Sequence, residues 1–123
     1  MSVPGSRFRF GGFELDGSSN ELRKNGLRIR IEEQPFRILW MLVSRQGEMV
    51  AREELKEALW TDDTHVDFDR SLNRAVNKVR LAIGDSASNP RFIETLSRRG
   101  YRFVAPASVI DETRENSQGT PES

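Results

Sequence analysis

The sequence lacks cysteine and has a single histidine, His65, among its 123 residues. Without cysteine there can be no disulfide framework and no thiolate metal site, and a reducing compartment is favoured. No second histidine or HxxE pattern accompanies His65, and the chain has neither a phosphate-cradling glycine loop nor a nucleophile elbow. We therefore expect a protein that is not an enzyme and that needs no metal or cofactor.

Long hydrophobic runs are also missing. The longest apolar patch, ILWMLV at residues 38–43, is far shorter than the about 18–20 residues that a membrane-spanning helix needs. The N-terminus, MSVPGSRFRF, lacks the apolar core of a signal peptide. Hydrophobic residues nevertheless make up 36% of the chain, which is enough for one globular core. We expect a cytoplasmic protein with a disordered leader at 1–6, one folded domain at 7–105 and a flexible tail or linker at 106–123.

The chain as a whole carries no net charge, because 19 Lys and Arg balance 19 Asp and Glu. The charges are nevertheless segregated along the sequence. Residues 35–69 contain four basic and eight acidic residues, whereas residues 70–104 contain eight basic and two acidic residues, a local net charge of +6. A polyanion responds to a local basic surface rather than to the total charge. A nucleic-acid contact is therefore expected first in residues 70–104.

The spacing of apolar residues predicts strands first and helices afterwards. Over residues 7–31 the segments FRF, FEL and LRIRI alternate apolar and polar positions, and Asn25-Gly26 is a strong hairpin signal. The pattern then changes to helical spacing. It predicts a helix from about Pro35 that ends at Gly47, a second at about 51–60 and a third from about Asp69 to Gly84. The expected buried stripe of the third helix consists of Leu72, Ala75, Val76, Val79 and Ile83.

Two short strands joined by the turn SRRG follow the third helix. They are predicted at residues 91–96 and 101–104. We expect Gly100 to adopt a positive φ that lets this hairpin close sharply, with Arg98 and Arg99 projecting from its tip. Charge at a hairpin tip can simply keep it soluble, or it can enter the narrow, negative minor groove of DNA. Three helices with a hairpin behind the third are the layout of a winged helix-turn-helix.

The face of the third helix opposite its apolar stripe is cationic and carries amides. No acidic residue lies between Arg70 and Gly84. Arginine and lysine bind guanine edges or phosphates, and asparagine binds adenine. One interpretation is an ordinary solvated helix face, and the other is a helix that enters the major groove. The residues on or near this face are Arg70, Asn73, Arg74, Asn77, Lys78 and Leu81.

Arg52 opens the second helix, in the segment VAREEL. An arginine and the free N–H groups of a helix N-terminus can share one phosphate. The alternative is a surface pair with Lys56 or with acidic neighbours, and the sequence does not separate the two. The acidic loop that follows this helix lacks the spacing and the glycine of a calcium-binding loop.

Three segments carry a resemblance to a known family: EEQPFRILWMLVSRQGEMVAREELKEALW, VDFDRSLNRAVNKVRLAIGD and NPRFIETLSRRGYRFVA. Over about residues 8–105 the chain resembles the winged-helix effector domain of OmpR/PhoB-type bacterial transcription regulators. It is most similar to the branch of CadC and ToxR, which has this domain at the N-terminus. The resemblance implies an α+β fold, a winged helix-turn-helix with an N-terminal four-stranded antiparallel sheet, three helices and a C-terminal β-hairpin wing. A short strand near residues 48–50 would pair with that hairpin.

The resemblance also implies sequence-specific binding of double-stranded DNA, with the third helix in the major groove and the wing at the minor groove. In this reading Arg52, Arg80 and the wing contact phosphates, and Arg74, Asn77 and Lys78 contact base edges. The matching helix positions are Arg70, Ser71, Asn73, Arg74, Asn77, Lys78 and Arg80. The matching wing positions are Thr95, Ser97, Arg98 and Arg99. The loop at 61–67 matches the segment that in some relatives meets RNA polymerase, with Asp62, Asp63 and His65 as candidates.

We further expect tandem or dimeric binding on repeated half-sites, because a single module of this size would bind weakly alone. No receiver domain precedes residue 7, and the tail ends at Ser123. We therefore expect an effector domain of a longer regulator, with a sensor or membrane segment after the tail. The alternative function is a winged-helix protein-interaction module that uses the acidic loop and the N-terminal sheet. Exposed apolar residues on the third helix would favour that alternative.

Overall fold

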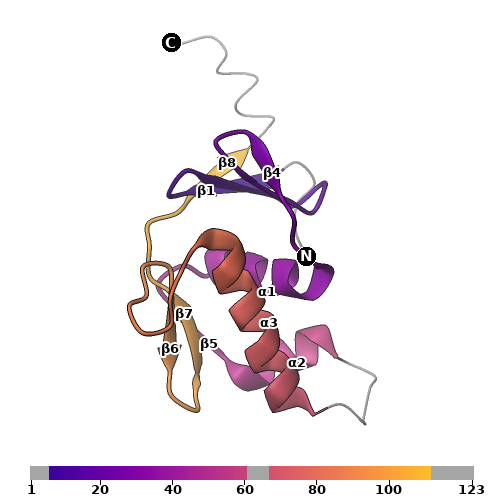
Figure 1. Cartoon of the computed structure of the whole chain (residues 1–123), viewed down its shortest axis with the longest axis vertical. Helices are drawn as coiled ribbons and strands as arrows, with labels where there is room; N and C mark the ends of the chain where they lie inside the picture. Colours follow the sequence, from indigo (N-terminus) through magenta and orange to yellow (C-terminus); the bar gives the residue numbers. More distant parts are fainter. Residues whose placement is uncertain (1–5, 61–66, 112–123) are drawn as a thin grey trace.

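The computed structural model describes residues 6–60 and 67–111, which form two antiparallel sheets and three helices (Figure 1). The order along the chain is four strands, a helix, a strand, two helices and three strands. The strands are β1 (Ser6–Phe10), β2 (Phe13–Asp16), β3 (Glu21–Lys24), β4 (Leu27–Ile29), β5 (Met49–Ala51), β6 (Ile93–Leu96), β7 (Gly100–Phe103) and β8 (Ser108–Asp111). The helices are α1 (Glu33–Ser44), α2 (Arg52–Leu59) and α3 (Phe68–Ile83). The α+β winged-helix architecture predicted from the sequence is confirmed.

The N-terminal sheet has five strands, in the order β4-β3-β2-β1-β8. The first four are the predicted ones, and both residues of the Asn25-Gly26 turn have a positive φ, as a tight hairpin with primed-turn geometry requires. The fifth strand corrects the expected tail. Residues 108–111 do not form a flexible linker but pair antiparallel with β1, with Phe8 opposite Val109. The folded part therefore extends past residue 105, because the backbone of β8 finds its hydrogen-bond partners on the open edge of β1.

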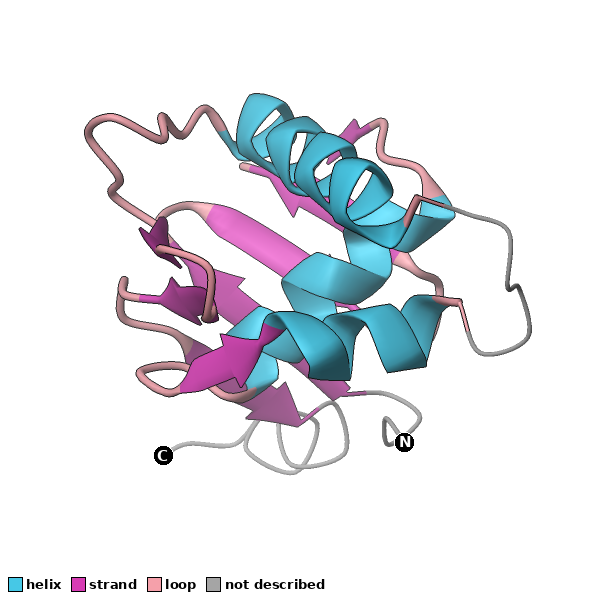
Figure 2. Cartoon of the chain, turned by 90° about the horizontal axis from the view of Figure 1, so that it is seen from below, coloured by secondary structure: helices cyan, strands magenta, loops and turns pink. Residues whose placement is uncertain are grey.

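Local sequence features account for where the helices begin and end. Pro35 lies in the first turn of α1, where a missing N–H removes no helical hydrogen bond. The side chain of Asp67 caps α3 by accepting from the backbone N–H of Arg70 at 3.2 Å. Gly84 ends α3 with a left-handed φ of 68°. Viewed from below (Figure 2), the three helices lie together in front of most of the strands.

The core joins the two sheets through the helices. Every residue of the predicted stripe on α3 is buried. From the N-terminal sheet, Phe10 stacks on Phe13 and contacts Phe103 of β7 edge-to-face, with ring centroids 5.4 and 5.0 Å apart. These aromatic contacts hold the C-terminal hairpin against the N-terminal sheet.

The hairpin of β6 and β7, here called the wing, pairs with β5 in a second sheet of order β5-β7-β6. The prediction that Gly100 adopts a positive φ at the turn is wrong. The positive φ at the turn belongs to Arg98 (63°), whereas Gly100 lies in β7 directly opposite Ala51. A Cβ at position 100 would stand 2.2 Å from the backbone oxygen of Val50. Glycine is therefore required at position 100 by the close approach of β5, not by the turn.

Candidate nucleic-acid interface

The solvent-facing side of α3 presents a cationic stripe. Arg70, Arg74 and Asn77 are exposed on it, on the side away from the buried stripe. Arg70 lies near the helix N-terminus, and its Nε is 3.7 Å from a carboxylate oxygen of Asp67. In the described part of the chain, no hydrogen bond or ion pair involves the side chains of Arg74 or Asn77. Their donor groups are therefore available to an external ligand.

Lys78 differs from its neighbours because it is already paired. Its Nζ donates to Glu32 Oε1 at 2.8 Å, which ties α3 to the residue that precedes α1. The hydrogen bond from Lys78 lowers the pKa of the Glu32 carboxyl. Both side chains remain largely exposed, at 46% and 69%. Such a surface pair is weak, so Lys78 can exchange this partner for a phosphate or a base at little cost.

Arg52 connects three elements at the start of α2. Its Nη1 donates to Tyr101 Oη at 3.0 Å and to Asn73 Oδ1 at 3.2 Å, and its Nη2 pairs with Asp69 Oδ1 at 3.1 Å. Burial alone would lower the pKa of Arg52, but its bonds to Asp69 and Tyr101 raise that pKa. Arg52 thus pairs with Asp69, 17 positions later in the chain, rather than within α2 as the surface-pair alternative expected, and its contact with a phosphate stays a prediction.

The hydroxyl of Tyr101 completes this arrangement by donating to Asn73 Oδ1 at 3.2 Å. Asn73 is exposed, and its amide oxygen accepts from both Arg52 and Tyr101. The amide nitrogen keeps its two N–H donors for a ligand. Tyr101 and Asp69 were not among the predicted site residues. Apolar spacing assigned Tyr101 to a strand, and nothing in the sequence indicates that its hydroxyl reaches α3.

The wing tip and the N-terminal half of α3 border one hollow. It is lined by the following residues from α2, α3 and the wing: Arg52, Glu53, Lys56, Asp69, Asn73, Arg98 and Arg99. Arg98 and Arg99 are exposed, and the backbone oxygen of Arg99 accepts from the N–H of Arg52 at 3.0 Å. Asp69 is the central anion here, and hydrogen bonds from Arg52 and Lys56 lower its pKa. The structure therefore brings the predicted wing arginines beside the predicted helix.

Arg80 corrects one prediction. It was expected to contact a phosphate, but it is only 6% exposed. Its Nη2 donates to the backbone oxygen of Ile93 at 2.9 Å and to Thr95 Oγ1 at 2.8 Å. Arg80 thus fastens α3 to β6 and has no free face for a ligand. Position 80 lies at the border of the apolar stripe, where a long side chain can reach the neighbouring strand.

The remaining predicted positions fall into two groups. Thr95 and Ser97 are exposed on the wing, and Ser71 is half-buried on the first turn of α3. Thr95 already accepts from Arg80 but keeps its own O–H to donate. The loop candidates lie outside the described residues, and these are Asp62, Asp63 and His65.

Asp85 shapes the connection from α3 to the wing. Its Oδ1 accepts from the N–H of Arg91 at 2.7 Å, and its Oδ2 accepts from the N–H of Ile93 at 2.9 Å. Burial would raise the pKa of this carboxyl, but the backbone hydrogen bonds outweigh burial and lower it. The ionised carboxylate thereby sets where β6 begins relative to the end of α3.

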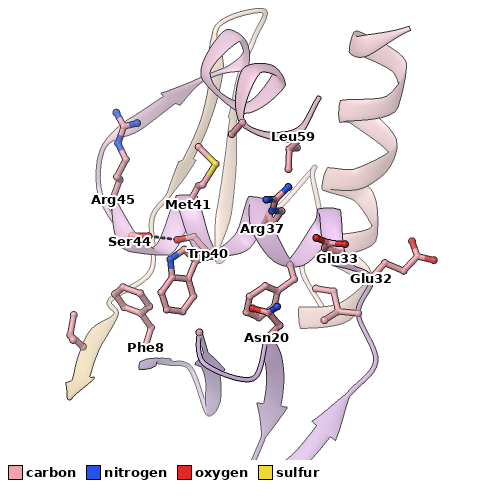
Figure 3. A pocket seen from close by; sticks show the side chains of 15 residues that line it. Phe8, Asn20, Glu32, Glu33, Arg37, Trp40, Met41, Ser44, Arg45 and Leu59 are labelled. Carbon is pink, nitrogen blue, oxygen red and sulfur yellow. Dashed lines mark hydrogen bonds between the residues drawn. The ribbon is translucent and has the colours of Figure 1, made fainter. Parts of the chain in front are cut away.

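A second hollow lies between the N-terminal sheet and α1 (Figure 3). Phe8 and Trp40 meet edge-to-face in it at 4.9 Å, and Glu33 and Arg37 lie along α1. Its lining contains no histidine, and the lowered pKa of Glu32 is the opposite of what a general acid needs.

Neither a metal site nor a membrane span emerges from residues 6–60 and 67–111. Within them, no three potential ligands from His, Asp and Glu come together as a metal ion would require. None of the helices in these two ranges combines the length and the apolar character needed to cross a bilayer.

Comparison with known proteins places these features in context. Residues 26–103 match the family described as transcriptional regulatory protein, C terminal. The cholera toxin transcriptional activator of Vibrio cholerae is 31% identical over 84 residues, which are 68% of this chain and 29% of that protein. Its homologue in Vibrio parahaemolyticus is 34% identical over 108 residues, 85% of this chain and 37% of that protein. The chain thus spans about a third of the length of these two relatives.

Solved structures share the fold. The response regulator DrrB of Thermotoga maritima, described as an OmpR/PhoB homologue, is 31% identical with a TM-score of 0.70, over 80% of this chain and 44% of that one. The RstA DNA-binding domain of Klebsiella pneumoniae, solved in complex with the RstA box, is 26% identical with a TM-score of 0.69. That match covers 80% of this chain and 96% of the RstA domain.

Proposed function

Because the chain belongs to the transcriptional regulatory protein C-terminal family, with the OmpR/PhoB-type winged-helix fold, we propose that it binds double-stranded DNA in a sequence-specific manner. The observation that carries this proposal is that Arg98 and Arg99 of the wing border one hollow with Asn73 of α3, the residue that precedes Arg74 of the cationic stripe. A similar domain, that of RstA, has been solved on its DNA box. This is the effector role of a bacterial transcription regulator.

In the proposed complex, α3 lies in the major groove. Its 16 residues span about 24 Å, enough to follow the groove past several base pairs. Arg74 and Asn77 have free donors and contact base edges, since arginine pairs with guanine and asparagine with adenine. Lys78 joins them after leaving Glu32, and Arg70 contacts the backbone. Asn73 donates its free amide N–H groups to a phosphate.

The wing supplies the second contact. Arg98 and Arg99 are exposed at its tip and reach the adjacent minor groove, whose negative potential attracts arginine. The hydroxyls of Thr95 and Ser97 donate to nearby phosphates. Arg52 acts through other residues, because it positions Asn73 and the wing.

Three further partners or placements belong to this proposal. We propose that copies bind in tandem on repeated half-sites, where avidity offsets the weak affinity of one module. We also propose that the loop with Asp62, Asp63 and His65 contacts RNA polymerase, which rests on the family resemblance alone. The parent regulator would place this domain in the cytoplasm, with a membrane anchor after the tail. The alternative of a protein-interaction module is not favoured. It calls for several exposed apolar residues on α3, and this helix (residues 68–83) exposes just one large apolar residue, Leu81.

Fluorescence anisotropy with a labelled AT-rich duplex across a salt series tests the proposal. We expect wild-type affinity to fall with salt with a log–log slope of about −0.9 per phosphate contact. Arg98→Ala/Arg99→Ala should weaken binding and flatten the slope by about 1 to 2. Arg74→Ala/Asn77→Ala should instead reduce the preference for a selected sequence over a scrambled one.

A matched control is Lys24→Ala/Arg28→Ala, which removes two exposed cations from β3 and β4 at the other end of the molecule (Figure 1). This variant should retain wild-type affinity and slope. Absence of saturable wild-type binding at low salt, to any duplex offered, would exclude the proposed function. Equal weakening by the control pair would show attraction by general charge instead of a defined interface.

A further inference from the structure

One residue on the proposed DNA-facing side of α3 is chemically unlike its neighbours. Leu81 is 81% exposed, more than any other large hydrophobic residue in the described part of the chain. It lies nine residues after the buried Leu72, and successive helical residues are offset by about 100°. Leu81 therefore points almost directly away from the core, and the domain's own packing does not explain it.

Leu81 continues the stripe that carries the predicted base contacts. Asn77 precedes it by one helical turn and Arg74 by two, so the three side chains lie along one line of the helix. The other exposed large hydrophobic residues, Leu27, Val104 and Val109, all lie outside α3. An aliphatic group thus stands at the C-terminal end of an otherwise polar, cation-rich surface.

The edges of the bases offer one apolar group in the major groove, the C5-methyl of thymine. Resting on the proposed function, we propose that Leu81 is a specificity-determining residue that packs against thymine methyl groups. It would select an A·T pair next to the positions that Arg74 and Asn77 contact. Leu81 lies four positions after Asn77, a rise of about 6 Å along the helix, or one to two base-pair steps. The selected thymine lies at that distance from the Asn77 contact.

Replacing thymine by uracil tests this directly, because it removes only the methyl group. Duplexes bound by the full chain are first selected from a random library. Each thymine of the selected site is then replaced by uracil, one at a time, and affinity is measured by anisotropy. For wild type we expect one or two positions at which uracil weakens binding by roughly three- to tenfold.

Leu81→Ala should bind the thymine duplex as weakly as wild type binds the uracil duplex at those positions, and should show no further loss with uracil. Leu81→Met, which keeps an apolar side chain, should restore part of the sensitivity to the methyl group. The matched control Leu27→Ala removes an equally exposed leucine from β4 and should leave the uracil profile unchanged.

The inference is overturned if Leu81→Ala keeps the wild-type uracil profile. It is also overturned if that variant lowers affinity only on paired half-sites, since Leu81 would then contact a second copy of the chain. Failure of wild type to enrich any sequence is a separate result, because it removes the proposed function itself. Circular dichroism of each variant confirms that the helix content is retained.

Discussion

Arg52 and Tyr101 meet through a hydrogen bond of 3.0 Å between Nη1 and the phenol oxygen, and this bond links the start of α2 to the wing. Tyr101 in turn donates to Asn73 on α3. The wing and α3 are therefore held together by side chains as well as by the core. In the proposed complex α3 and the wing contact two DNA grooves at once, so this bond would constrain the geometry of the whole interface.

Removal of the Tyr101 hydroxyl alone should loosen this link. We expect Tyr101→Phe to lower the free energy of unfolding by about 0.5–1.5 kcal/mol, because a part-buried donor and acceptor lose their partner. Urea denaturation followed by circular dichroism measures this change. Ser97→Ala, which removes an exposed hydroxyl from the same hairpin, should change it by far less. Equal unfolding free energies for Tyr101→Phe and wild type would contradict the structural role.

Gly100 should tolerate no side chain. The Cβ of Gly100→Ala would overlap the Val50 oxygen, so β5 and β7 must separate. We expect a loss of about 3 kcal/mol in stability. At Gly84 a Cβ meets no neighbouring atom, so Gly84→Ala should cost only about 1 kcal/mol for its left-handed φ. Thermal or urea unfolding of both variants tests the order, and a smaller loss at position 100 than at position 84 would refute the explanation.

Asp85 should make stability depend on pH. Its backbone hydrogen bonds hold its folded pKa below the ordinary value of an aspartate, so ionised Asp85 stabilises the native state at any pH above the unfolded pKa. That contribution is lost as pH falls through the folded pKa. We expect Asp85→Asn to cost about 2 kcal/mol near neutral pH, where it disrupts hydrogen bonds to a charged acceptor. The difference from wild type should shrink steadily below about pH 4.

Urea denaturation of both proteins from pH 2 to pH 7 checks this expectation. The other carboxyl groups titrate in both proteins, so the comparison isolates Asp85. A difference that stays constant over the whole range would mean that the Asp85 charge does not contribute.

Glu32 should lower the affinity for DNA, because its carboxylate forms an ion pair with Lys78. In Glu32→Gln the Lys78 ammonium loses its anionic partner and becomes free for the duplex. We expect the affinity for DNA to rise about two- to fivefold at low salt, with the gain disappearing as salt screens the charges. Glu33→Gln is the matched control, since it removes the adjacent carboxylate and leaves the Lys78 pair intact. An equal gain in both variants would show that net charge alone is responsible.

Local periodicity was enough to predict most of the fold. The apolar stripe of α3 and the Asn25-Gly26 turn follow from spacing and turn chemistry, which depend on residues close in sequence. β8 escaped prediction because its short segment becomes a strand only by pairing with β1, at the other end of the domain. The predicted need for glycine at position 100 had the wrong cause for a similar reason. The atoms that crowd Gly100 belong to β5, which is distant in sequence.

In the candidate interface, too, features set by residues close in sequence were predicted, and features set by distant residues were not. The exposure of Arg74, Asn77 and Arg98 agrees with their predicted positions, since helical and hairpin geometry orient them. Arg80 did not behave as predicted, because its partners Ile93 and Thr95 lie on a strand that spacing along α3 cannot locate. A basic residue on a helix can bind a ligand or secure a neighbouring element, and only the packed structure separates the two.

The pairing of β1 with β8 has a consequence for how the domain is made. Ser6 lies opposite Asp111, so the N-terminal sheet is completed by nearly the last described residues. During synthesis β1 emerges early but keeps one unpaired edge until the wing and β8 have left the ribosome. Contacts this distant in sequence slow folding and leave that edge open to other chains meanwhile. The edge of β1, which is made first, is thus protected from pairing with other chains only when β8, at the end of the domain, has been made.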